Sequence, residues 1–321
     1  MNMDEPPVTP TLHRWHEGLL ERCRRLAPVS TAVAHPCDPD SLAGAIEAAA
    51  LGLIAPVLIG PRTKIEAAAA AAKVDIAGFR LEHTPHSHAA AARAVELIRA
   101  GEAEVLMKGS LHTDELMSAV MSAQTGLRTA RRISHAYLMD VPRYPKPLLI
   151  SDAAVNIAPN LEDKRDIVQN AIDLAHILGI ETPLVAILSA VETINSKLQS
   201  TLDAAALCKM ADRGQITGGL LDGPLAFDNA IDMEAALDKG IISQVAGQAD
   251  ILIVPDLVSG NILAKQLIYL AGADAAGVVL GARVPIILTS RADSPRTRIA
   301  SCAVAVMMTR RDRVGVVPLS A

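Results

Sequence analysis

Short apolar runs alternate with amphipathic, alanine-rich segments along almost the whole chain. Residues 55–60 and 105–108 have the length and composition of buried strands. Residues 161–178 instead repeat apolar side chains at spacings of three and four, which is typical of a helix that buries one face. A strand followed by a helix, repeated many times, predicts an α/β fold built on a mainly parallel sheet.

The same reading assigns most of the remaining chain. We expect strands at residues 55–60, 105–108, 133–139, 148–151, 184–188, 219–222, 250–254, 277–280 and 285–289. We expect helices at residues 13–25, 65–73, 89–100, 114–122, 161–178, 201–211, 233–239, 261–271 and 295–308.

The length of 321 residues is enough for two domains. Three prolines, at positions 142, 145 and 147, crowd one connection and suggest where the chain crosses between two α/β lobes. We therefore expect a first lobe made of residues 1–140 plus 282–321, and a second lobe made of residues 141–281.

The composition excludes several classes of protein. Half of the residues are hydrophobic but only six are aromatic, so the core is built from Ala, Val, Ile and Leu. No apolar run approaches the roughly 18–20 residues that a membrane span needs, and the acidic, proline-rich start lacks the layout of a secretion signal, so we expect a cytoplasmic protein. A net charge of −5 with few aromatic residues argues against nucleic-acid binding. The four cysteines are scattered singly, which favours reduced core thiols and no metal.

Ligands of open α/β sheets gather beyond the carboxyl ends of strands, so charged turns after strands are candidate sites. The first such turn carries Ser290, Arg291 and Asp293 and leads into a helix with Ser294 at the N-cap and Pro295 at the first position. Free amides at a helix N-terminus and a guanidinium fork both suit phosphate, so we expect an oxyanion there. The alternative is a capped surface turn in which Arg291 pairs with Asp293.

A second turn carries Lys108, Ser110, His112 and Thr113 after the strand at 105–108. These side chains can donate hydrogen bonds, and Gly109 permits close approach of the backbone, so the turn is a candidate phosphate site. The turn lacks the two glycines of a P-loop, and capping of the next helix by Ser110 or Thr113 is an equal alternative.

A third turn contains Asp256, followed by Asn261 and, one helical turn later, Lys265. Asp256 is a candidate for orienting a donor or accepting a proton, and an ordinary helix start is the alternative.

A basic cluster of Arg128, Arg131 and Arg132 precedes the strand at 133–139. It suits the pyrophosphate of a nucleotide-bearing substrate, or else it is a solvated loop. His135 lies inside the strand, where we expect a hydrogen-bonded core residue. The sequence contains neither Gly-x-Gly-x-x-Gly nor Gly-x-Ser-x-Gly, so neither a standard dinucleotide fold nor a serine hydrolase is indicated.

Taken together and in order, several segments resemble the phosphate acetyl/butyryltransferase family, in particular its butyryltransferase-like branch. The resemblance spans about residues 53–308. It is carried by residues 152–159 (DAAVNIAP), 190–195 (AVETIN), 221–228 (LDGPLAFD), 249–256 (ADILIVPD) with Gly260 and Asn261, 278–283 (VVLGAR) and 288–294 (LTSRADS).

The resemblance implies two α/β lobes that share a cleft, similar to isocitrate and isopropylmalate dehydrogenases, and usually a homodimer. It also implies the reversible reaction of an acyl-CoA with phosphate to give an acyl phosphate and CoA, with acetyl expected before longer chains. CoA is then a substrate, and no permanently bound cofactor is expected. The hydratase domain that precedes this module in some relatives is missing, so no hydratase activity is expected.

The family's catalytic pair falls on Ser290 and Arg291. Acetyl-specific relatives carry an Asp seven residues after that serine, where this chain has Thr297, so Asp293 or Asp256 is left as the candidate base. The alternatives are phosphate butyryltransfer, a CoA-binding module without catalysis, and an NAD-dependent 2-hydroxy-acid dehydrogenase, which the missing fingerprint disfavours.

Overall fold

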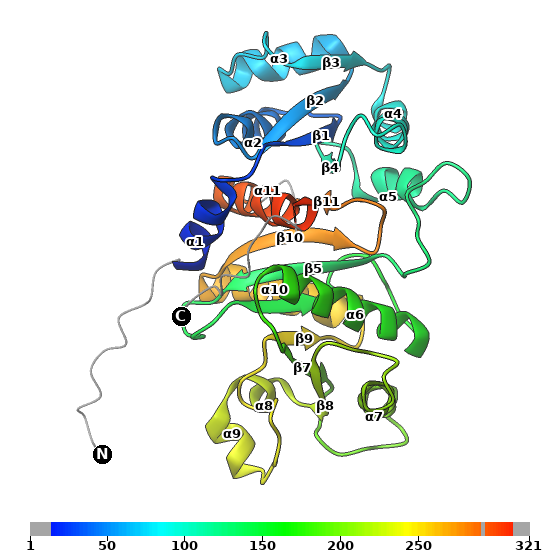
Figure 1. The fold of residues 1–321 in the computed structure, drawn as a ribbon, viewed down its shortest axis with the longest axis vertical. Helices are drawn as coiled ribbons and strands as arrows, with labels where there is room; N and C mark the ends of the chain where they lie inside the picture. Colours follow the sequence, from blue (N-terminus) through cyan, green and yellow to red (C-terminus); the bar gives the residue numbers. More distant parts are fainter. Residues whose placement is uncertain (1–13, 290–292, 311–321) are drawn as a thin grey trace, which may run out of the picture.

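The computed structural model describes residues 14–289 and 293–310 of the chain. Within these residues eleven strands form one mixed sheet, in the order β3-β2-β1-β4-β11-β10-β5-β6-β9-β7-β8 (Figure 1). The strands are β1 (Val29–Ala34), β2 (Ile54–Gly60), β3 (Arg80–His83), β4 (Val105–Lys108), β5 (Ser134–Asp140), β6 (Leu148–Ser151), β7 (Leu184–Leu188), β8 (Leu220–Leu225), β9 (Ile251–Ile253), β10 (Asp274–Leu280) and β11 (Ile286–Ile287).

The strands in the two halves of this sheet run in opposite directions. β1 to β4 and β11 are parallel to one another, and so are β6 to β9. Between these groups, β10 is antiparallel to both β11 and β5, and β5 is antiparallel to β6. The carboxyl ends of the strands in the two parallel groups therefore point in opposite directions along the strand axes.

Helices cover both faces of the sheet. The buried apolar residues form a single cluster on one face and two separate clusters on the other. Buried residues of α1, α2, α3, α6, α7 and α11 join into one apolar cluster. On the opposite face, α4 and α5 pack into one cluster, and α8, α9 and α10 into another. The helices are α1 (Arg14–Cys23), α2 (Pro39–Ala50), α3 (Arg62–Ala72), α4 (Ser87–Arg99), α5 (Thr113–Met121), α6 (Leu161–Ile177), α7 (Gln199–Asp212), α8 (Phe227–Ile231), α9 (Met233–Asp238), α10 (Leu257–Ala271) and α11 (Pro295–Thr309).

The last helix begins as the sequence predicts. Ser294 is its N-cap and accepts a hydrogen bond from the Thr297 amide at 3.1 Å, and Pro295 is its first residue. Every residue of α11 from Thr297 to Met307 is buried. The helix therefore runs through the interior of the protein.

The strand β1 and the helix α2, which follow α1, were not predicted from the sequence, and neither were β3 and α8. Several predicted boundaries also differ. Near the site, α10 begins at Leu257, one turn earlier than expected, β10 begins at Asp274, and β11 is limited to Ile286–Ile287. Helices long and apolar enough to cross a membrane do not occur in the described ranges. The α/β prediction agrees with the described sheet and helices, and the assignment of particular residues to two lobes stays a prediction.

Candidate active site

A cavity of about 690 Å³ lies where the apolar cluster of α4 and α5 meets the cluster of α8, α9 and α10. Its walls come from the first residues of α5 and from α10, and its floor comes from the strands between them. The lining residues are Lys108, Leu111, His112, Thr113, Tyr137, Ala154, Leu257, Val258, Asn261, Ile262, Lys265, Leu288 and Thr289. Five residues that the sequence analysis singled out for substrate binding therefore line one cavity.

The ends of two neighbouring strands bring Lys108 and Thr289 together. β4 and β11 are parallel, with Met107 opposite Ile287, so the residues that follow them leave the sheet side by side. Both residues are buried, and the Lys108 Nζ donates to the carbonyl oxygens of Gly109 at 3.3 Å and Thr289 at 3.5 Å. Lys108 of the second candidate turn and Thr289, the residue before the first, thus meet at the cavity floor.

Gly109 and Ser110 hold the second turn in place. A Cβ on Gly109 would lie 2.5 Å from the carbonyl oxygens of Ala34 and His35, so only glycine fits this approach to β1. The Ser110 hydroxyl donates to the His35 carbonyl at 2.8 Å and accepts from the Cys37 amide at 3.2 Å. Ser110 therefore braces the turn and does not line the cavity. The N-cap of α5 is His112, without a side-chain cap bond, so neither Ser110 nor Thr113 is the expected cap.

The third turn shapes the opposite wall. Asp256 is the N-cap of α10, and its carboxylate accepts from the Ser259 amide at 2.9 Å and the Ser259 hydroxyl at 2.7 Å. Partial burial raises the pKa of Asp256, but hydrogen bonds from Ser259 and from the Val258 amide outweigh it, so this pKa lies below its ordinary value. The carboxylate itself is occupied at the helix start.

Close packing sets the position of α10 above the strands. A Cβ on Gly260 would lie 2.7 Å from the Asp152 carbonyl oxygen, so glycine lets the helix approach the backbone after β6. The Asn261 amide donates to the Ala153 carbonyl at 3.3 Å. Asn261 and Lys265 follow each other at one helical turn and both line the cavity.

The floor between the walls contains a residue that the sequence analysis did not select, Tyr137 of β5. Its ring lies edge-to-face against the ring of His135, with centroids 4.4 Å apart. His135 is fully buried, as expected, but the expected hydrogen bonds are absent, because neither ring nitrogen has a partner in the described part of the chain. Burial lowers the pKa of His135 to about 3, so its imidazole is neutral near pH 7.

Ser290 and Arg291, the predicted catalytic pair, lie outside the described residues. Of the described residues on either side, Thr289 lines the cavity. Burial and, to a smaller extent, the charge of Asp293 raise the pKa of Tyr137 to about 12. Thr297 is buried, and its amide and hydroxyl are both within reach of Ser294, at 3.1 Å each. A threonine held in this way does not replace the missing carboxylate.

The two remaining predicted residues, Arg128 and Arg132, line a separate hollow of about 230 Å³. The Arg132 guanidinium donates to the Asn156 Oδ1 at 2.6 Å and lies 3.4 Å from the Asp163 carboxylate. The structure therefore does not bring these two arginines to the cavity that holds the other candidates, and their role in binding stays a prediction.

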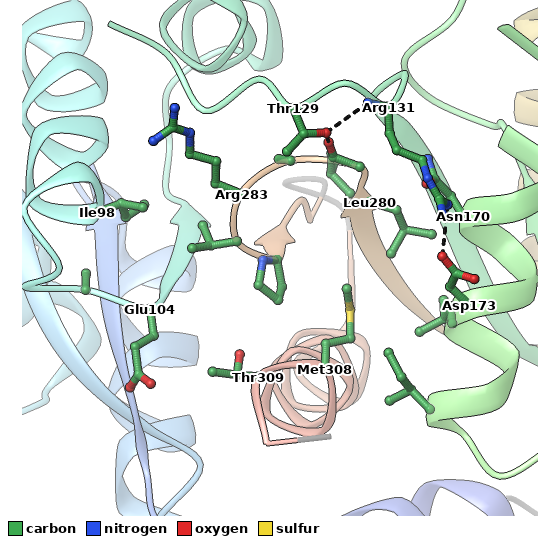
Figure 2. Close-up of a pocket in the computed structure, with 18 of the residues that line it drawn as sticks. Ile98, Glu104, Thr129, Arg131, Asn170, Asp173, Leu280, Arg283, Met308 and Thr309 are labelled. Atoms are coloured by element: carbon green, nitrogen blue, oxygen red, sulfur yellow. Dashed lines mark hydrogen bonds and ion pairs between the residues drawn. The ribbon is translucent and has the colours of Figure 1, made fainter. Parts of the chain in front are cut away.

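A further cavity of about 650 Å³ opens beside the C-terminal end of α11 and the amino ends of β4, β5 and β11 (Figure 2). Arg131 on one side is paired with Asp173 at 2.9 Å, and Thr309 belongs to the last turn of α11. The end of a helix presents carbonyl groups and partial negative charge, which disfavours an anionic ligand. The cavity between α5 and α10 is therefore the candidate active site.

Comparison with known proteins shows the family to which this chain is similar. The model of a family described as "Phosphate acetyl/butaryl transferase" matches residues 84–306. A protein of Rhizobium meliloti named phosphate acetyltransferase is 63% identical over 93% of this chain and 94% of its own length. A phosphate butyryltransferase of Clostridium acetobutylicum is 39% identical over 89% of this chain and 95% of its own.

The fold agrees as well. The crystal structure of a branched-chain phosphotransacylase from Enterococcus faecalis has a TM-score of 0.75 and 28% identity to this chain, and the match covers 88% of this chain and 99% of that one. The expected α/β class and the resemblance found in the sequence are both confirmed. The chain is a member of the phosphate acetyl/butyryltransferase family.

Proposed function

We propose that this enzyme transfers a short acyl group reversibly between CoA and inorganic phosphate, with acetyl as its first expected substrate. An acyl-CoA and phosphate give an acyl phosphate and CoA. The observation that carries the proposal is the 63% identity, over almost the whole chain, to a protein named phosphate acetyltransferase. Butyryl transfer is the second candidate, because a protein named phosphate butyryltransferase is 39% identical.

We place the phosphate end of the reaction where β4 and β11 end. Lys108 is buried at this point with its ammonium group beside the Thr289 carbonyl, and Ser290 and Arg291 come next in the chain. An ammonium and a guanidinium together neutralise the charge of a leaving or attacking phosphate. In this proposal Arg291 clamps the phosphoryl group, and Ser290 donates a hydrogen bond to a phosphate oxygen or to the acyl oxyanion.

The CoA end is assigned to the walls. Asn261 and Lys265 of α10 face His112 and Thr113 of α5 across the cavity. Lys265 is exposed, so its cation can meet the phosphates of CoA at the mouth without the cost of burying a charge. Arg128 and Arg132, which line the separate hollow, are proposed as further contacts for the nucleotide part of CoA.

Chemistry in the direction of acyl-CoA synthesis begins with the CoA thiol. Its sulfur attacks the carbonyl carbon of the acyl phosphate, a carbon–sulfur bond forms, and the carbon–oxygen bond to phosphate breaks. The thiol proton passes to a base or to the departing phosphate. Asp293, whose charge acts on Tyr137 in the cavity, is the first candidate for this base, and Asp256, which caps α10, is the second. A free thiol has a pKa of about 8.5, so only a small fraction of it is thiolate near pH 7. Nearby cations stabilise the thiolate and increase this reactive fraction even without a base.

Substitution of Arg291 tests this proposal. With acetyl phosphate and CoA as substrates, we expect Arg291→Ala to lower the turnover number by about 10²-fold or more. Arg213→Ala, at an exposed position after α7, is the matched control. A folded Arg291→Ala protein with the turnover of the wild type would overturn the assignment of Arg291.

Acyl-chain length is tested by comparing acetyl-, propionyl- and butyryl-CoA. Each buried methylene contributes about 0.8 kcal/mol, so the ratio of the specificity constants reports how much room the acyl group has. If the protein binds CoA but catalyses no phosphate- or arsenate-dependent loss of thioester, it is a CoA-binding module without catalysis.

We also propose that the protein is a homodimer, in line with the resemblance found in the sequence. Val258, Ile262, Tyr269 and Leu270 of α10 are all more than half exposed. A helix that is apolar on several sides is usually buried against something. Sedimentation analysis of the wild type and of Leu270→Glu tests this, with a monomeric wild type as the contrary result. The cytoplasmic location stays a prediction.

A further inference from the structure

Tyr137 presents an uncommitted hydroxyl at the floor of the cavity. The side chain is mostly buried and lines the cavity, yet its hydroxyl forms no hydrogen bond with any residue that the structure describes. By contrast, the Tyr144 hydroxyl donates to the Ala249 carbonyl at 2.6 Å. The Tyr137 hydroxyl opens onto the cavity, where a ligand can accept its hydrogen bond.

The surrounding residues fix the direction of this ring. His135 packs edge-to-face against it, and both rings lie over Gly277 on the neighbouring strand β10. A Cβ on Gly277 would lie 3.1 Å from the His135 Nε2 and 3.2 Å from the Tyr137 Cε1. A glycine at this point in a central strand therefore leaves the space that the two rings occupy.

The register of the sheet places Tyr137 close to the end of β11. Tyr137 is opposite Gly277 in the pairing of β5 with β10. A Cβ on Gly277 would in turn lie 3.1 Å from the Leu288 carbonyl oxygen, directly before Thr289. The Tyr137 ring thus lies near Leu288 and Thr289, where the phosphate end of the reaction is assigned. The acyl carbon bonded to that phosphate is therefore placed close to the Tyr137 ring.

We propose that the Tyr137 hydroxyl is a catalytic hydrogen-bond donor to the acyl carbonyl oxygen, with His135 and Gly277 as the residues that position its ring. This inference rests on the proposed function, because it names a further group of the same site. As the CoA sulfur bonds to the carbonyl carbon, the carbonyl π electrons move onto the oxygen, and the hydrogen bond from Tyr137 stabilises that charge. The electrons return as the bond to phosphate breaks, and Tyr137 keeps its proton throughout.

The electrostatics of the ring fit a donor that does not ionise. Burial and the charge of Asp293 raise the pKa of Tyr137 to about 12. The phenol is therefore protonated across the physiological range and can donate at every step. The imidazole of His135 next to the Tyr137 ring is neutral, so it adds no positive charge that would compete with Lys108 for phosphate.

The variant Tyr137→Phe removes one oxygen and tests the proposal in the full-length enzyme. Acetyl transfer from acetyl phosphate to CoA is expected to slow about 10–1,000-fold in kcat, whereas KM for CoA changes less than about threefold. The midpoint of thermal unfolding is expected to stay near that of the wild type, because the hydroxyl has no partner among the described residues. Tyr144→Phe removes the same atom from a tyrosine that does not line the cavity and is expected to retain wild-type kcat.

A spectroscopic measurement separates a donor from a purely structural ring. Isotope-edited infrared spectra of bound acetyl-CoA, labelled with ¹³C at the carbonyl carbon, report the strength of the hydrogen bond to the carbonyl oxygen. We expect the carbonyl band at higher wavenumber in Tyr137→Phe than in the wild type or in Tyr144→Phe. An unchanged band together with a kcat within twofold of the wild type would overturn the role of Tyr137 and leave the proposed function intact. A wild-type protein without acyl transfer would overturn both.

Discussion

The Nζ of Lys108 and the carbonyl oxygen of Thr289 lie 3.5 Å apart although 181 residues separate them in the chain. The parallel pairing of β4 with β11 produces this contact and so joins the first half of the chain to its last strand. The contact fixes the Lys108 ammonium at the floor of the cavity, which is where the proposed function needs a positive charge.

Replacement of Lys108 by methionine keeps most of the volume of the side chain and removes its charge. If this ammonium holds phosphate, we expect the kcat/KM for phosphate, measured with acetyl-CoA, to fall about 10²-fold or more. Lys197→Met makes the same change at an exposed position and is expected to keep wild-type kinetics. Equal values of kcat/KM for phosphate in the two folded variants would contradict a phosphate-binding role for Lys108.

The sequence predicted most elements of this fold because their apolar periodicity is strong, and it missed β1 for a physical reason. The sequence of Val29–Ala34 contains serine, threonine and two alanines, and such a strand is recognisable only once its neighbours bury it. The start of α2 has a local signal in the sequence, because Asp38 is its N-cap and Pro39 is the next residue.

The candidate site could be predicted only in part for a similar reason. Lys108, Asn261 and Lys265 stand near the ends of predicted elements, so a rule about strand ends selects them. Tyr137 lies within a strand, and its place in the cavity depends on the antiparallel pair β5 and β10. Strand order and direction come from contacts distant in sequence, which periodicity does not encode.

The replacement Gly277→Ala tests whether the rings of His135 and Tyr137 need the space that the glycine leaves. The added methyl group would stand 3.1 Å from the Leu288 carbonyl oxygen and 3.2 Å from the Tyr137 Cε1, so the rings must move. We expect the free energy of unfolding to fall by about 1–3 kcal/mol and kcat for acetyl transfer to fall as well. Gly78→Ala adds a methyl group where no atom lies within 4 Å, and it should change neither quantity. Wild-type kcat in Gly277→Ala would mean that the exact position of Tyr137 is unimportant.

The N-cap of α10 gives a prediction about stability and pH. Asp256→Ala removes the cap and is expected to cost about 1 kcal/mol, whereas Asp256→Asn keeps an oxygen acceptor and should cost less near pH 7. The pKa of Asp256 is lowered in the folded protein, so the ionised carboxylate stabilises the fold above its unfolded pKa. This contribution is lost as the pH falls through the folded pKa. Urea unfolding of the wild type and Asp256→Asn from pH 7 to pH 3 should therefore show their difference shrinking, and a constant difference would contradict it.

His135 predicts a second, distinct dependence on pH. Burial lowers its pKa to about 3, whereas an unfolded histidine has a pKa of about 6.5. Between these values the unfolded chain binds a proton that the folded chain does not, so the free energy of unfolding falls as the pH is lowered below about 6.5. From pH 7 to pH 5 this loss amounts to about 2 kcal/mol. The variant His135→Leu lacks the titrating group and should lose less stability over the same range, while His83→Leu, at an exposed histidine, should follow the wild type. Parallel curves for His135→Leu and the wild type would mean that His135 becomes protonated within the folded protein.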